Sequence, residues 1–124
     1  MELVQLDESE LAFPPVEQAL SQPNGLLAIG GDLSPQRILL AYRQGIFPWF
    51  GAHQPILWWS PDPRGVLVPE AMHCSRSLLK ELKRHDLRCW INRDFAQVIQ
   101  ACAAPRRDCD ETWISREMQT AYLQ

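Results

Sequence analysis

The sequence predicts a mixed α+β fold, because short apolar runs bounded by glycine or proline alternate with segments of helical periodicity. The apolar runs predict four short strands, at residues 3–6, 56–59, 65–68 and 88–92. The helical segments are each preceded by a capping residue, and these are Ser34, Ser75 or Ser77, Asp94 and Ser115.

Length and composition indicate a globular protein with a hydrophobic core. The chain has 124 residues, of which 46% are hydrophobic and 22% charged, and its mean hydropathy is -0.24. Folding a chain of this size buries roughly two-thirds of the surface that the unfolded chain exposes. No segment approaches the ~20 apolar residues of a membrane span, and the acidic N-terminus lacks the features of a secretory signal. We therefore predict a cytoplasmic protein with no membrane partner.

The first helix is delimited by Ser34 and Pro35 at its start and by Gly45 after its end. Each predicted helix has an apolar side. These sides comprise Ile38, Leu39, Ala41 and Tyr42; Leu78, Leu79 and Leu82; Phe95, Val98, Ile99 and Cys102; and Ile114, Met118, Ala121 and Tyr122. The last helix runs to Gln124 without a stop signal, which suggests a chain cut from a longer protein.

Residues 25–32 place an apolar run between glycines, as a phosphate-binding loop does. The spacing matches neither G-x-G-x-x-G nor the P-loop, so we predict a tight turn here instead. The four cysteines form no C-x-x-C pair, and the three histidines lack metal-ligand spacing. We predict reduced, buried thiols and no metal site.

A basic stripe follows the second predicted helix. Its members are Arg76, Lys80, Lys83 and Arg84, at i, i+4, i+7 and i+8. The net charge of the whole chain is -3, but residues 63–104 carry a net positive charge. Two interpretations stay open: a solvated surface, or a face that binds a polyanion such as nucleic acid.

Aromatic residues and prolines alternate in residues 45–50 and 58–64. Proline fixes φ, so large rings spaced by prolines indicate a rigid surface, which is either a core seam or a stacking platform. Rings combined with a basic stripe are typical of sites for single-stranded nucleotide ends.

Four ordered blocks resemble the bacterial leucyl/phenylalanyl-tRNA-protein transferases. They lie at residues 23–35, 45–50, 58–64 and 112–116. The resemblance implies transfer of Leu or Phe, with Met as a further candidate, from aminoacyl-tRNA to the N-terminal Arg or Lys of an acceptor protein, which marks it for degradation under the N-end rule. It also implies a small N-terminal α/β domain, residues 1–62, followed by the first part of a GCN5-acetyltransferase-like domain, residues 63–124.

The resemblance also implies site residues. It assigns Trp49, Trp113 and Tyr42 to the 3'-terminal adenosine of the tRNA, and Arg76, Lys80, Lys83 and Arg84 to the tRNA body. Trp58 and Trp59 are predicted to be packing residues. No catalytic residue falls in this chain, because family members continue beyond the position of Gln124 and carry there the Asp and Gln that act in the chemistry. No metal or cofactor is implied, and we expect a monomer.

Two other functions stay open from the residues alone. One is a non-catalytic RNA-binding module that uses the same rings and cations. The other is a small-molecule acyltransferase, although acetyl-CoA transfer would need a pyrophosphate-binding turn at a helix N-terminus, and the sequence has no such motif.

Overall fold

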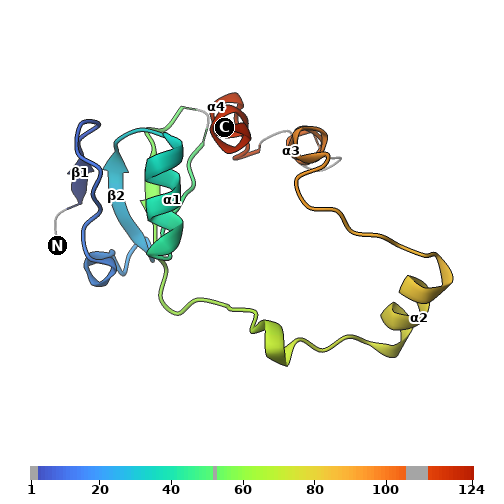
Figure 1. The fold of residues 1–124 in the computed structure, drawn as a ribbon. Coiled ribbons are helices and arrows are strands. Elements are labelled where there is room, and N and C mark those ends of the chain that lie inside the picture. Colours follow the sequence, from blue (N-terminus) through green and yellow to red (C-terminus); the bar gives the residue numbers. More distant parts are fainter. Residues whose placement is uncertain (1–2, 52, 106–111) are drawn as a thin grey trace. The chain divides into compact units, whose positions relative to one another are not determined.

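The computed structural model describes residues 3–51, 53–105 and 112–124. It divides into two compact units. The first consists of Met1–Asp62 together with Phe95–Gln124, and the second of Pro63–Asp94. Within the described residues, four helices and a four-stranded mixed sheet confirm the predicted α+β class (Figure 1).

The sheet belongs to the first unit and has the strand order β1-β2-β4-β3. The strands are β1 (Val4–Leu6), β2 (Leu26–Gly30), β3 (Phe47–Pro48) and β4 (Leu57–Trp59). β1 pairs with β2 in parallel, whereas β2 with β4 and β4 with β3 are antiparallel. The strands predicted at residues 3–6 and 56–59 are thus confirmed.

β2 is a central strand of the sheet, so the prediction of a tight turn over residues 25–32 was wrong. Leu26, Leu27 and Ala28 are buried, and burial on both sides gives a continuous apolar run rather than an alternating one. The glycines act at the strand's end, where Gly30 and Gly31 adopt positive φ angles of 85° and 71°.

Helix α1 (Pro35–Arg43) begins as predicted, with the Ser34 hydroxyl accepting a hydrogen bond from the Arg37 amide at 3.3 Å. Its predicted apolar side is only half correct. Ile38 and Ala41 are buried, but Leu39 and Tyr42 are exposed and Arg37 is buried in their place. This orientation of the helix lets the buried Arg37 guanidinium bond to the Asp32 carboxylate and to three backbone carbonyls.

The core joins the sheet to α1 and α4. Its buried residues are Leu27, Ala28, Ile38, Ala41, Ile46, Trp58 and Ala121. Helix α4 (Arg116–Leu123) begins at the predicted cap, where the Ser115 hydroxyl accepts from the Met118 amide at 3.2 Å. Helix α3 (Phe95–Cys102) packs beside α4 and buries Ile99.

The second unit contains helix α2 (Arg76–Arg84), capped by Ser75 as one of the two predicted starts. The strands predicted at residues 65–68 and 88–92 are not formed, and Ile91 is 91% exposed. A strand needs a neighbouring strand to complete its hydrogen bonds, and neither segment is paired with a described residue. Leu78, Leu79 and Leu82 are also exposed, contrary to the prediction that they pack.

Two short 3-10 helices complete the described elements, at Val16–Gln18 and Pro69–Ala71. The prediction of buried thiols was wrong for the described cysteines, because Cys89 and Cys102 are exposed and Cys74 is half-buried. Cys109 lies outside the described residues. None of the helices in the described ranges has the length and apolar character to cross a membrane.

Candidate nucleic-acid interface

Trp49 follows edge strand β3 directly. Its amide donates to the Leu57 carbonyl at 3.0 Å, which extends the pairing of β3 with β4 by one residue. Pro48 beside it is buried, whereas Trp49 is 52% exposed. The strand therefore holds an accessible indole ring on a fixed backbone.

Trp59 contacts Trp49 from the neighbouring strand. Its indole N–H donates to the Trp49 carbonyl at 2.6 Å, and the two ring centroids lie 6.0 Å apart at an interplanar angle of 58°. Trp58 differs from Trp59: it is fully buried, as predicted, and its indole N–H donates to the Gly30 carbonyl at 3.0 Å. Successive residues of a strand point to opposite faces, which separates the two neighbouring tryptophans.

Tyr42 lies on the exposed side of α1 and is 53% exposed. Its hydroxyl lies 2.7 Å from the hydroxyl of Tyr122 on α4, and the two rings meet edge to face at 6.3 Å. Burial, and then the hydrogen bond with Tyr42, raise the pKa of Tyr122 above its ordinary value of 10.0. Sequence reasoning placed Tyr122 only on an apolar helix side, and no sequence signal pairs it with Tyr42.

Trp113 precedes α4 and is 43% exposed. The Thr112 hydroxyl accepts from the Ile114 amide at 3.1 Å, which closes a turn around Trp113. The three rings assigned to the adenosine thus share the first unit and are all accessible. Within the described residues, however, no ring contact joins Trp49 to Tyr42 or to Trp113.

The basic stripe lies on α2 in the second unit, and all four of its members, Arg76, Lys80, Lys83 and Arg84, are exposed. Glu81 partly neutralises this helix. One of its carboxylate oxygens lies 3.7 Å from the Arg84 guanidinium, and the other lies 3.0 Å from the His85 imidazole. Exposed pairs of this kind contribute little energy, so the stripe stays available to a polyanion.

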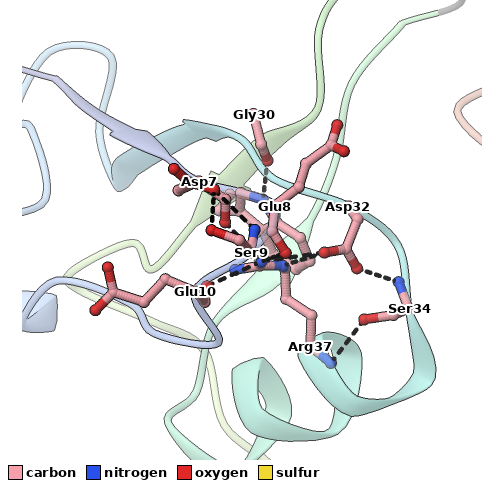
Figure 2. A network of polar contacts seen from close by, with 9 residues as sticks. Asp7, Glu8, Ser9, Glu10, Gly30, Asp32, Ser34 and Arg37 are labelled. Carbon is pink, nitrogen blue, oxygen red and sulfur yellow. Dashed lines mark hydrogen bonds and ion pairs between the residues drawn. The ribbon is translucent and has the colours of Figure 1, made fainter.

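Figure 2 shows a polar network around Arg37 that the sequence did not predict. The buried guanidinium donates to the Asp32 carboxylate at 3.1 Å, and to the carbonyls of Asp7 at 2.9 Å, Glu8 at 3.4 Å and Glu10 at 3.0 Å. Burial alone would raise the pKa of Asp32, but hydrogen bonds from Ser34 and Arg37 outweigh it and hold that pKa below 3.8. The network ties the segment after β1 to the start of α1.

A hollow of about 510 Å³ adjoins this network in the first unit. Glu8, Asp32 and Glu117 line it together with Arg116. A surface with more acids than bases repels phosphate, so the charge of this hollow does not favour a nucleic-acid backbone. In the described part of the chain, no three His, Cys, Asp or Glu side chains are grouped closely enough to hold a metal ion.

The first unit carries accessible rings and the second carries a basic helix, and proteins that bind single-stranded nucleic acid ends use both kinds of feature. Comparison with known proteins is more specific. Residues 31–62 match the family model of the leucyl/phenylalanyl-tRNA protein transferase N-terminal domain. Residues 66–124 match the leucyl/phenylalanyl-tRNA protein transferase model.

Curated relatives carry the same name. The leucyl/phenylalanyl-tRNA--protein transferase of Azotobacter vinelandii is 60% identical over 117 residues, which cover 94% of this chain and 52% of that protein. That of Pseudomonas fluorescens is 59% identical over 98% of this chain and 54% of its own length. The chain therefore belongs to the leucyl/phenylalanyl-tRNA protein transferase family, and it spans about half the length of the curated relatives it matches.

Proposed function

We propose that this chain is the tRNA-binding part of an aminoacyltransferase that moves Leu or Phe from aminoacyl-tRNA to the N-terminal Arg or Lys of an acceptor protein. The observation that carries this proposal is the match to two models of one family, at residues 31–62 and 66–124 in order along the chain. The exposed rings of the first unit and the exposed cations of α2 support it.

The proposed reaction is the aminolysis of an ester. The nitrogen of the acceptor's α-amine attacks the aminoacyl carbonyl carbon, the bond from that carbon to the ribose oxygen breaks, and the amine's proton ends on the ribose hydroxyl. With a pKa of about 7.7–8.0, an α-amine is already partly neutral near pH 7, so a strong base is not required. Orientation of the amine and ester supplies on the order of 7–11 kcal/mol.

We assign the 3'-terminal adenosine to Trp49, Trp113 and Tyr42. Their exposure supports this assignment, since a base can stack only on an accessible ring. The tRNA body is assigned to the basic stripe of α2, whose exposed cations suit a phosphate backbone. No catalytic residue is assigned to this chain.

The domain division after residue 62 remains part of the proposal, and the N-terminal family model that ends at that residue supports it. We likewise propose that residues 63–124 begin an acetyltransferase-like domain. A bacterial tRNA-dependent enzyme works where charged tRNA is found, so we propose that the protein is cytoplasmic. We also propose that it is a monomer. Its partners are aminoacyl-tRNA and acceptor proteins.

The rings are tested by filter binding of phenylalanyl-tRNA and deacylated tRNA to the purified chain. Trp49→Ala removes a stacking ring and should weaken binding roughly 10- to 100-fold. Trp90→Ala is the matched control, because Trp90 is also exposed but has no assigned role. Equal retention of tRNA by wild type and Trp49→Ala would remove the adenosine assignment.

The stripe is tested by the salt dependence of the same binding. A Lys80, Lys83 and Arg84 triple Ala variant should flatten the slope of log K against log salt by about 2 to 3, since each phosphate contact contributes about 0.7–0.9. Arg43→Ala, an exposed arginine on α1, is the control. An unchanged slope would contradict the stripe's role.

A non-catalytic RNA-binding module is the alternative, because the exposed rings and the cations of α2 would suit it equally. Filter binding separates the two: the transferase part should prefer phenylalanyl-tRNA to an unrelated RNA of the same length, whereas a general RNA-binding module should retain both equally. A transfer assay with phenylalanyl-tRNA and an Arg-started peptide, run on this chain and on the A. vinelandii relative, tests the chemistry, and we expect transfer by the relative but only binding by this chain. Transfer by this chain at the relative's rate would show that the chain holds the chemistry as well.

A further inference from the structure

We propose that Trp59 is a positioning residue that fixes the ring of Trp49 for stacking against a nucleotide base. This inference rests on the proposed function of Trp49. It concerns a residue that contacts Trp49 directly, whereas sequence reasoning assigned Trp59 to packing alone.

The backbone of Trp49 is bonded at both of its polar groups. Its amide donates to the Leu57 carbonyl at 3.0 Å, and its carbonyl accepts from the Trp59 indole at 2.6 Å. Pro48 precedes it with a φ angle fixed by the ring. An edge strand normally leaves some of its polar groups to solvent, whereas here the Trp59 indole N–H satisfies the Trp49 carbonyl.

The Trp59 ring also limits where the Trp49 ring can turn. The centroids lie 6.0 Å apart at 58°, within the range of favourable aromatic pairs. Trp49 keeps 52% of its surface exposed beside this neighbour. One part of the ring is therefore held by Trp59 while the rest is open to a base.

The two neighbouring tryptophans of β4 thus have separate tasks. Trp58 is buried, and its indole N–H bonds to the Gly30 carbonyl, which anchors β4 to the core. Trp59 is half-buried on this anchored strand. A ring that is already oriented loses less conformational freedom on binding. Trp59 strengthens binding in this way without contacting the base itself.

The test uses Trp59→Phe, which retains a ring and removes the N–H donor. Its affinity for phenylalanyl-tRNA should fall about 2- to 10-fold, the effect of losing one neutral hydrogen bond and part of an aromatic contact. A double-mutant cycle with Trp49→Ala identifies the cause. If Trp59 acts through Trp49, the double variant binds no more weakly than Trp49→Ala. Equal losses from Trp59→Phe with and without Trp49 would overturn the proposal.

Two measurements on the free wild-type chain do not depend on folding of the variant. The Trp59 indole N–H should exchange with solvent more slowly than that of exposed Trp90, and the ring pair should give an exciton couplet in circular dichroism. Rapid exchange of the Trp59 N–H would overturn the positioning role. If instead Trp49→Ala binds like wild type while Trp59 is protected, the proposed function of Trp49 fails and the contact itself stands.

Discussion

Tyr42 and Tyr122 join α1 to α4 through hydroxyl groups 2.7 Å apart, although 80 residues separate them in the chain. Ala121 beside Tyr122 belongs to the same buried core as Ala41 beside Tyr42. The tyrosine pair therefore forms the exposed margin of the contact that attaches the last helix to the sheet.

Tyr122→Phe should lower the free energy of unfolding by about 1 kcal/mol, the net value of one hydrogen bond. Urea unfolding followed by tryptophan fluorescence measures this change. Tyr42→Phe removes the same bond from the other side, so the double variant should lose no more than either single variant. Fully additive losses would mean that the two hydroxyls act separately.

Arg37→Met should destabilise the chain by about 3 kcal/mol, because it leaves the Asp32 carboxylate without its cation and three carbonyls without their donor. Met retains much of the side-chain volume, so the loss reports polar contacts. Arg43→Met is the matched control on the same helix, where the side chain is exposed. Similar urea midpoints for the two variants would contradict the role of the network.

The Asp32 carboxylate should make stability depend on pH. Its pKa in the folded state is below the ordinary 3.8, so its stabilising effect is present above pH 3.8 and is lost as pH falls through the folded value. Asp32→Asn should therefore be less stable than wild type near pH 7, with the difference shrinking in acid. Asp7 also has a lowered pKa, through hydrogen bonds from Ser9, and it titrates in both proteins. A difference that stays constant with pH would exclude this ionisation as the cause.

Gly25→Ala should destabilise the first unit by at least about 2 kcal/mol. Gly25 has a φ of 89°, and an added Cβ would overlap the Cα of Pro61. Gly65→Ala is the control, since a Cβ there meets no atom within 4 Å. Thermal unfolding should separate the two variants, and equal melting temperatures would contradict the close approach.

Local signals predicted the helices well. Ser34, Ser75 and Ser115 each cap a helix that begins at the next residue, because capping depends on a side chain and the amide three residues on. Strands depend on partners that are distant in sequence. The strand predicted at residues 56–59 forms β4 and pairs with β2 and β3, whereas residues 65–68 and 88–92 pair with no described residue and are irregular.

The candidate site was predicted unevenly for the same reason. Motif resemblance assigned Trp49 and the α2 cations, and the structure shows them exposed. It did not predict the hydrogen bonds that the side chains of Trp59, Tyr122 and Arg37 make with residues distant in the sequence. The tight turn predicted over residues 25–32 was wrong for the same reason, since only pairing with β1 and β4 makes residues 26–30 a central strand.

The chain leaves the first unit at Asp62 and returns to it at Phe95. The second unit, Pro63–Asp94, consequently joins two parts of the first unit and sets the effective concentration of α4 at the sheet. Doubling the length of a flexible connection costs only about 0.6 kcal/mol of closure entropy. Insertions there would slow the arrival of α4 during folding more than they would weaken its final attachment.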